Sequence, residues 1–176
     1  PFRHNKLKGY FKKHKTMHQF TIGIEEEYQI IDVESRDLVS HVSKIIEGGK
    51  ATLSENLKHE MHESMIEMET GICQNIHEAR AELTQLRHNL IKIAHEQNLR
   101  VSGGGTHPFS HWKENSITQG ERYIKIVDDM GDVARGNLIF GLHVHIGFPT
   151  GEEAVEFKMW GPSFFPHFMP LSPISP

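Results

Sequence analysis

The stretch FTIGIEEEYQII, residues 20–31, alternates apolar and polar side chains with a period of two. Its isoleucines at 22, 24 and 30 fall on even positions, whereas Glu25 and Glu27 fall on odd positions. This period is typical of a β-strand whose two faces have different surroundings. We therefore expect a strand that carries Glu25 and Glu27 on one face. Glu26 would point with the apolar residues, at an edge of the sheet that solvent reaches.

The rest of the chain mixes helical and extended patterns. The spacing of Ala79, Leu83, Leu86, Leu90 and Ile93 predicts a helix over residues 77–98. We expect further helices over residues 122–136 and from residue 152, and a short one before residue 48. Strands are expected over residues 60–73, 99–102 and 137–148. Strands and helices without strict βαβ alternation favour an α+β fold, with a mixed or antiparallel sheet covered by helices.

Composition narrows the class of protein. The 176 residues suit one domain, and 19 basic against 23 acidic residues give a net charge of -4, which would not attract nucleic acid or an anionic membrane. Membrane-spanning and signal-peptide patterns are both missing. Cys73 is the single cysteine, which excludes an intramolecular disulfide and a cysteine-based zinc cluster. We expect a cytoplasmic protein without nucleic-acid or membrane partners, and homo-oligomerisation stays open.

The two ends of the chain differ from its middle. Residues 1–19 are rich in lysine and are expected to form a basic arm, so the domain would comprise residues 20–176. Residues 161–176 contain five prolines and stop without a natural end. We expect the domain to be incomplete at this end.

Two pairs of residues have the spacing of a binding site. Glu25 and Glu27 would lie roughly 7 Å apart on one strand face, where two like charges need a cation such as Mg²⁺ with its nucleotide phosphates. His143 and His145 repeat this spacing, and imidazoles ligate metals or donate to phosphate. The alternatives are a solvated acidic strand and histidines that bond to neighbouring carbonyls.

Other residues offer weaker signals. Glu60 and Glu67 could add carboxylates, but residues 60–73 suit neither period cleanly, so the position of Glu60 stays open. The glycines before Thr106, ending at Gly105, could present backbone N–H groups to an anion, although a tight turn explains them equally.

Four segments together resemble one family. Residues 20–32, 67–73, 105–109 and 140–147 are similar, in order and spacing, to the type 2 glutamate–cysteine ligases, also described as carboxylate-amine ligases. The resemblance runs from about residue 20 to the end and covers the N-terminal half of the family pattern. It implies a glutamine-synthetase-like sheet. It also implies that ATP phosphorylates glutamate and that cysteine or another amine then displaces phosphate to give a γ-glutamyl amide.

The resemblance also implies roles for particular residues. Divalent cations, Mg²⁺ or Mn²⁺, would be held by Glu25, Glu27, Glu60, Glu67 and His143. His145 and Glu67 would be catalytic, with His145 beside the transferred phosphate. Gly105 and Thr106 would contact the nucleotide, and Thr70 or the Gly105 loop would lie beside the amino-acid substrate.

The chain departs from the family at its end. Family members are much longer, and Pro170 and Pro173 interrupt the segment that resembles the family's next helix. The sequence is therefore also compatible with two other functions. One is a metal-dependent hydrolase built on the His-x-His pair, and the other is a noncatalytic remnant that binds magnesium nucleotide.

Overall fold

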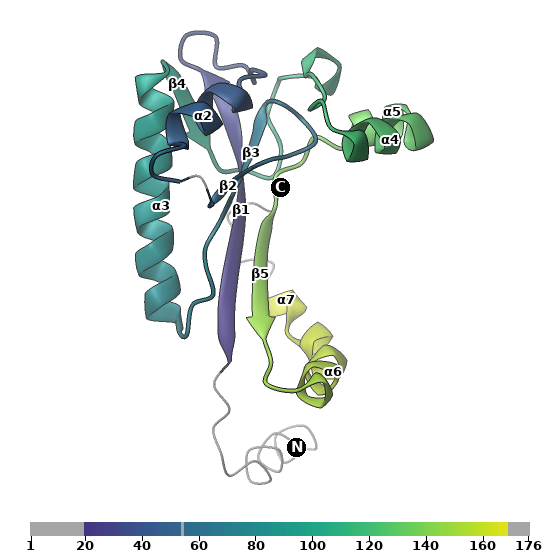
Figure 1. Cartoon of the computed structure of the whole chain (residues 1–176). Coiled ribbons are helices and arrows are strands. Elements are labelled where there is room, and N and C mark those ends of the chain that lie inside the picture. Colours follow the sequence, from purple (N-terminus) through teal and green to yellow (C-terminus); the bar gives the residue numbers. More distant parts are fainter. Residues whose placement is uncertain (1–19, 54, 169–176) are drawn as a thin grey trace.

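The structure is a computed structural model that describes residues 20–53 and 55–168 (Figure 1). The basic arm expected over residues 1–19 lies outside the described residues. So do residues 169–176, which hold the last three prolines of the tail. The organisation proposed for these two segments therefore stays a prediction.

Strand β1 (Thr21–Asp32) lies at the centre of a five-stranded antiparallel sheet. Along one edge, β3 (Met65–Glu69) pairs with residues 25–29 of β1, and β2 (Leu57–His59) pairs with β3. Along the other edge, β5 (Leu142–Gly147) pairs with residues 21–26 and β4 (Leu99–Ser102) with residues 29–32. The stretch with the clearest strand pattern thus organises the whole sheet.

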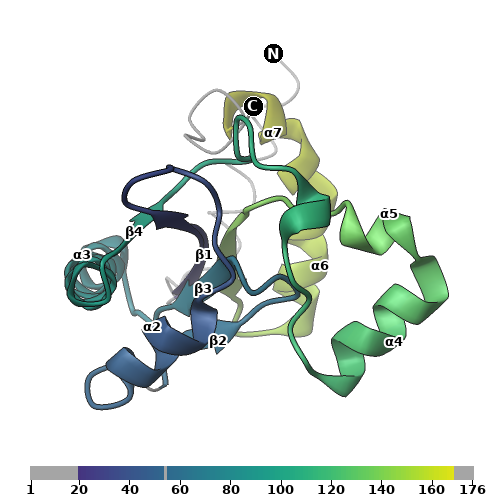
Figure 2. The same cartoon turned by 90° about the horizontal axis from the view of Figure 1, so that it is seen from above.

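Helices α2 (Val42–Gly49) and α3 (Ile76–Glu96) cover the face of the sheet that bears the even residues of β1 (Figures 1 and 2). α3 begins where the Asn75 side chain accepts hydrogen bonds from the N–H groups of His77 and Glu78. It ends just before Asn98, whose φ of 56° is left-handed. The apolar stripe of α3 completes the main core, formed by Ile30, Val42, Ile45, Leu53, Leu57, Ile66, Met68, Leu86, Leu90, Ile93, Ala94 and Leu99.

The opposite face carries a smaller core and the helices α4 (Glu121–Met130) and α5 (Asp132–Arg135) (Figure 2). Leu38, Met65, Leu138 and Phe140 pack together there. The short helix η1 (Trp112–Glu114) precedes α4, and α6 (Gly151–Trp160), η2 (Gly161–Ser163) and α7 (Phe165–Phe168) follow β5. The space between the sheet and α4–α5 is where the polar strand face points.

The expected α+β class is confirmed, and most predicted elements are present with shifted bounds. Residues 60–73 are not one strand, because only Met65–Glu69 pairs with β1, and the short strand β2 was not predicted. Residues 122–136 do not form one helix, because Gly131, with φ of 57°, separates α4 from α5. The strand expected over residues 137–148 starts only at Leu142, since Leu138 and Phe140 are buried in the smaller core.

Glu26 points with the apolar residues, as expected, but the expectation that it lies at a solvent-exposed edge is wrong. The residue is only 6% exposed, because β1 is central rather than an edge strand and α3 crosses the even face. Arg87 of α3 forms an ion pair with the Glu26 carboxylate, and the Tyr28 hydroxyl donates a hydrogen bond to the same group. A buried carboxylate is stable in such a place only when it is paired in this way.

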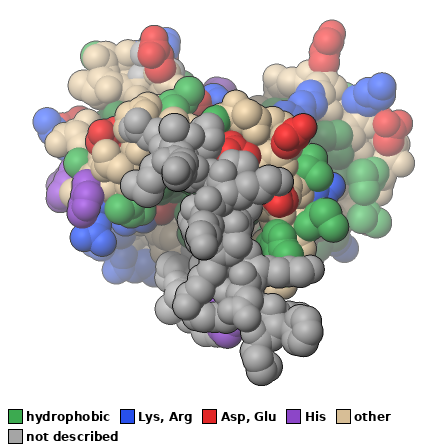
Figure 3. Space-filling model, turned by 90° about the horizontal axis from the view of Figure 1, so that it is seen from below, with side chains coloured by type: hydrophobic (Ala, Val, Ile, Leu, Met, Phe, Trp, Pro, Cys, Tyr) green, Lys and Arg blue, Asp and Glu red, His purple; other side chains and the backbone are tan. Residues whose placement is uncertain are grey.

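The strand β5 is exposed on both faces. Val144, which points away from His143 and His145, is 59% exposed. Figure 3 shows apolar side chains, in green, to the right of the grey residues. Among the exposed apolar residues, six belong to the segment from α6 to α7: Val155, Phe157, Met159, Trp160, Phe164 and Phe165. Across residues 20–53 and 55–168, none of the helices has both the length and the apolar character that crossing a membrane would require.

Candidate metal centre

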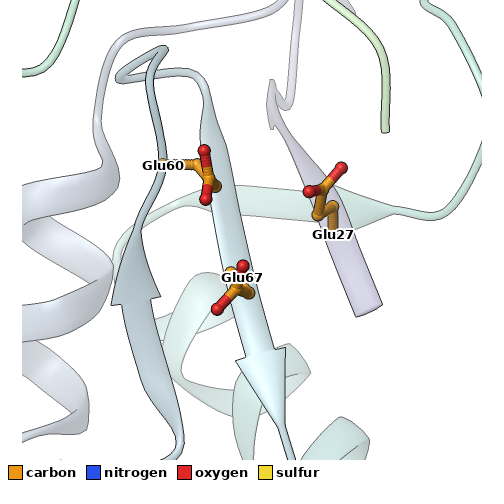
Figure 4. A group of neighbouring side chains, drawn as sticks. All are labelled: Glu27, Glu60 and Glu67. Atoms are coloured by element: carbon orange, nitrogen blue, oxygen red, sulfur yellow. The ribbon is translucent and has the colours of Figure 1, made fainter. Parts of the chain in front are cut away.

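Three carboxylates meet on the odd-residue face of the sheet (Figure 4). Glu27 projects from β1, and Glu67 lies directly opposite it on β3. Glu60 comes from the segment between β2 and β3, where its backbone carbonyl accepts a hydrogen bond from the Thr118 hydroxyl. One oxygen atom from each of the three side chains lies within 4.8 Å of the others. The structure therefore places Glu60 beside Glu27 and Glu67, which the sequence pattern left open.

The two histidines lie beside these acids and bond to Glu25. The register of β1 with β5 sets Glu25 opposite His143 and Gly23 opposite His145. Nδ1 of His143 and Nε2 of His145 each lie 2.9 Å from a different oxygen of the Glu25 carboxylate. The predicted alternation is thus confirmed, and the four residues Glu25, Glu27, His143 and His145 share one face.

Gly141 fixes the Glu27 side chain. The Gly141 N–H donates a hydrogen bond to the Glu27 carboxylate, and the Gly141 carbonyl accepts one from the Glu27 N–H. A Cβ at position 141 would lie 3.2 Å from a Glu27 carboxylate oxygen and 3.4 Å from Nε2 of His143. The absence of a side chain at Gly141 therefore lets the backbone just before β5 lie against the Glu27 carboxylate and leaves room for the His143 ring.

Protons bind unusually tightly to part of this cluster. Burial, followed by the charges of Glu60 and Glu25, raises the pKa of Glu67 to about 7, and burial also raises the pKa of Glu27. By contrast, the hydrogen bond from His143 lowers the pKa of Glu25, and the same contact raises the pKa of His143. Glu27 and Glu67 therefore lack a positive neighbour that fully compensates their charge.

A divalent cation fits this donor set. Mg²⁺ and Mn²⁺ prefer oxygen ligands, and oxygens around one such ion are spaced by a few ångströms, as the three carboxylates are here. A cation would also place positive charge beside Glu27 and Glu67, whose pKa values are raised by burial and by the neighbouring carboxylates. Glu27, Glu60 and Glu67 thus fit a divalent cation, and their role as metal ligands stays a prediction.

Thermal stability is expected to depend on pH and on cations together. Because the pKa of Glu67 is about 7 in the folded chain against 4.5 for the free side chain, the folded state binds the extra proton between these values. Stability without cations should therefore fall as the pH rises from 4.5 through about 7. Saturating Mg²⁺ or Mn²⁺ should reverse this loss, since metal binding competes with protons. Melting curves in EDTA and in Mn²⁺ across this range would check it, and a pH dependence that Mn²⁺ does not change would contradict it.

A pocket of about 530 Å³ opens beside the carboxylates, between the sheet and α4–α5. Glu27, Glu60 and His143 line one part of it, and Arg122 and Tyr123 of α4 line another. The remaining wall is largely apolar and includes Met61, Met65, Ile126, Met130, Val133 and Ile139. The pocket could accept a small molecule with one end at the carboxylates.

Comparison with known proteins assigns the chain to a family. The sequence profile of the family described as Glutamate-cysteine ligase family 2 (GCS2) matches residues 21–176. This match covers most of the chain. The chain belongs to glutamate–cysteine ligase family 2.

Relatives in this family are longer than the chain. It is 48% identical over 157 residues to a protein of Solibacter usitatus named as a candidate glutamate–cysteine ligase 2, and covers 41% of that protein. A protein of the same name from Sorangium cellulosum is 49% identical over 160 residues, with 43% of it covered. These alignments include 89% and 90% of this chain. The chain therefore spans less than half the length of these two family members.

A solved ligase has the same fold. The crystal structure of glutamate–cysteine ligase from Francisella tularensis in complex with AMP matches with a TM-score of 0.61 at 15% sequence identity. The match covers 83% of this chain and 30% of that ligase. These findings lend no support to the metal-dependent hydrolase considered from the sequence.

Thr70, Gly105 and Thr106, which were expected to contact the substrate or the nucleotide, lie outside the carboxylate cluster. The Thr70 hydroxyl accepts a hydrogen bond from the Ile24 N–H and donates one to the Gly71 carbonyl. The carbonyl of Gly105 accepts from the Phe140 N–H, and that of Thr106 accepts from the Gln29 amide. Gly105 and Thr106 do not line the pocket beside the carboxylates. Their proposed contacts with the nucleotide stay a prediction.

Sequence patterns missed several residues on this face. Lys58 of β2 lies opposite Glu67, and it precedes Glu60 by two positions, which is the one signal that could have indicated a shared face. Arg122 and Tyr123 occupy an amphipathic helix whose orientation depends on contacts with distant residues, such as the hydrogen bond from the Tyr123 hydroxyl to the His59 carbonyl. Periodicity within one element cannot predict such contacts.

Proposed function

We propose that this chain forms the metal- and phosphate-binding half of an ATP-dependent carboxylate-amine ligase. The observation that carries the proposal is the cluster of Glu27, Glu60 and Glu67, in which Glu27 and Glu60 line a pocket large enough for a small substrate. Family membership supports it, and so does the AMP bound to the ligase of similar fold. An enzyme that consumes ATP works where ATP is available, so we propose the cytoplasm as its location.

The proposed reaction has two steps. The γ-carboxylate of glutamate attacks the terminal phosphorus of ATP, the bond from that phosphorus to the ADP oxygen breaks, and an acyl phosphate forms. The nitrogen of an amine, cysteine or another, then attacks the acyl carbon, the carbon–oxygen bond to phosphate breaks, and the amine loses a proton. The products are a γ-glutamyl amide, ADP and phosphate.

Different residues of the site would bind the cation, contact the phosphate and orient the histidine rings. Glu27, Glu60 and Glu67 would bind Mg²⁺ or Mn²⁺, which when bound neutralises phosphate charge during phosphoryl transfer. His143 would complete this ligand set from β5. His145, whose Nε2 is held by Glu25, would donate a hydrogen bond from Nδ1 of its protonated ring to the transferred phosphate. Because both histidines bond to one carboxylate, Glu25 fixes their ring orientations before any substrate binds.

The pocket next to the carboxylates is the proposed place for the amine substrate. Its apolar wall would receive the side chain of the amine, and Arg122 could pair with a carboxylate of the same molecule. The amine nitrogen would then point toward Glu27 and Glu60, where the acyl group is formed. Family members that share the metal ligands can still differ in this wall, and so in the amine that they accept.

The decisive experiment is ADP release from Mg·ATP by the purified chain, with and without glutamate and a panel of amines. Release that requires glutamate, an amine and Glu27 is expected for a ligase, and Glu27→Gln should lower the rate by at least about tenfold. Glu34→Gln, a change in the turn after β1, serves as the matched control. Binding of Mg·ATP without amino-acid-dependent release, in this chain and in a version extended to the family length, would instead identify a noncatalytic nucleotide-binding protein.

A further inference from the structure

The carboxylate face carries one lysine that the proposed reaction has not used. Lys58 of β2 lies directly opposite Glu67 in the register with β3. Its Nζ atom is 2.5 Å from the carboxylate of Glu69, the next residue of β3 on the same face. Glu69 lies opposite Glu25 of β1. Lys58 therefore lies one strand away from the proposed cation ligands. It bonds to Glu69, a carboxylate that is not part of the three-residue cluster.

Charge balance gives this ion pair a specific effect. Glu25, Glu27, Glu60, Glu67 and Glu69 place five carboxylates on neighbouring positions of one face. The carboxylates of Glu69, Glu67 and Glu25 raise the pKa of the Lys58 ammonium, so it stays positively charged throughout the neutral range. Unlike the exposed pair of Lys92 and Glu96 on α3, this pair lies where a cation and phosphates would bind.

We propose that Lys58 is a positioning residue that sets the charge of the cation site. By holding Glu69 in an ion pair, it keeps this carboxylate out of the ligand set, and it leaves a fixed positive charge beside Glu67. This charge limits how tightly the site holds a divalent cation and favours the phosphate oxygens that arrive with it. The inference rests on the proposed function, because it assumes that Glu27, Glu60 and Glu67 bind the cation.

The proposal predicts opposite effects for the two members of the pair. Lys58→Gln frees the Glu69 carboxylate and removes a positive charge, so Mn²⁺ should bind about five to ten times more tightly. Glu69→Gln leaves Lys58 unpaired, so Mn²⁺ should bind weaker by about the same factor. The double variant should return to within about twofold of the wild type. Lys58→Arg keeps the charge and should behave like the wild type.

Binding of Mn²⁺ to each variant would be measured by electron paramagnetic resonance at low ionic strength, where such charges are least screened. Tripolyphosphate, added to the Mn²⁺-loaded chain, reports on the anion. Its affinity should fall about fivefold in Lys58→Gln, although Mn²⁺ binds more tightly there. Lys92→Gln is the matched control, because it removes a lysine from an exposed pair on the other face and should change neither affinity.

Each outcome decides a different point. Equal Mn²⁺ affinity in the wild type, both single variants and the double variant would show that the pair is only a surface contact. Weaker Mn²⁺ binding in Lys58→Gln would also overturn the proposal. If none of the proteins binds Mn²⁺, both the metal site and the role of Lys58 are wrong. If Mn²⁺ affinity responds as expected but ADP is never released, the role of Lys58 holds and the proposed ligase activity fails.

Discussion

Replacing Glu67 with Gln is expected to weaken Mn²⁺ binding by about a hundredfold, since it removes one of the three carboxylates of the cluster. The same change should raise the melting temperature in EDTA at a pH above 7. Above that pH the wild-type side chain is charged, although burial and the neighbouring carboxylates oppose the charge. Gln has nearly the same shape, so the packing of β3 should persist. A gain in stability combined with a loss of binding is unusual for a substitution in a sheet.

Calorimetric titration with Mn²⁺ and melting curves with and without EDTA would measure both effects. Glu63→Gln is a suitable control, because Glu63 lies in the same segment as Glu60 but outside the three-residue cluster. It should change Mn²⁺ affinity by less than about twofold. Undiminished Mn²⁺ binding by Glu67→Gln would remove β3 from the metal centre. A lower melting temperature in EDTA would show that the charge of Glu67 is already compensated in the wild type.

Replacing Glu26 with Gln is expected to have the opposite pattern. The side chain is buried between β1 and α3, where it pairs with Arg87 and accepts a hydrogen bond from Tyr28. Loss of its charge should destabilise the fold by about 2 kcal/mol, because hydrogen bonds to a buried charge are lost while the half-exposed guanidinium keeps part of its hydration. For a domain of this size, the melting temperature should fall by about 4–8 °C.

Mn²⁺ binding should change little in Glu26→Gln, since residue 26 points to the face opposite the metal centre. Chemical denaturation would measure the stability, and Glu96→Gln, in an exposed helix pair, provides the control. An unchanged melting temperature would mean that the pair with Arg87 adds nothing beyond packing. Strong loss of Mn²⁺ binding without loss of stability would mean that the two faces of β1 are assigned the wrong way round.

The sequence was sufficient wherever one element alone determines the position of a side chain. The period of two assigned Glu25, Glu27, His143 and His145 to one face, and the apolar spacing of residues 77–98 predicted α3. It was insufficient wherever the position depends on a distant partner. Glu26 was misplaced because Arg87, which pairs with it, lies 61 residues away in the sequence.

The same reason explains the uncertainty about Glu60 and the bounds of β5. Glu60 belongs to no strand, and it lies near Glu27 because its segment bonds to Thr118 and neighbours α4. Leu138 and Phe140 continue the apolar pattern of the strand that follows them, yet they are buried in the smaller core instead. The local pattern therefore predicts the direction in which a side chain points, whereas tertiary packing determines which residues it contacts.

The pairing of β1 with β5 has a consequence for the order in which the sheet forms. Glu25 and His143 are 118 residues apart, so closing this loop costs more conformational entropy than pairing β1 with β3. All six residues of β5 are exposed, so little apolar burial offsets that cost. This edge of the sheet should therefore form late in folding and open early in hydrogen exchange. A cation bound by residues of both β1 and β5 would stabilise the pairing of these two strands and slow its opening.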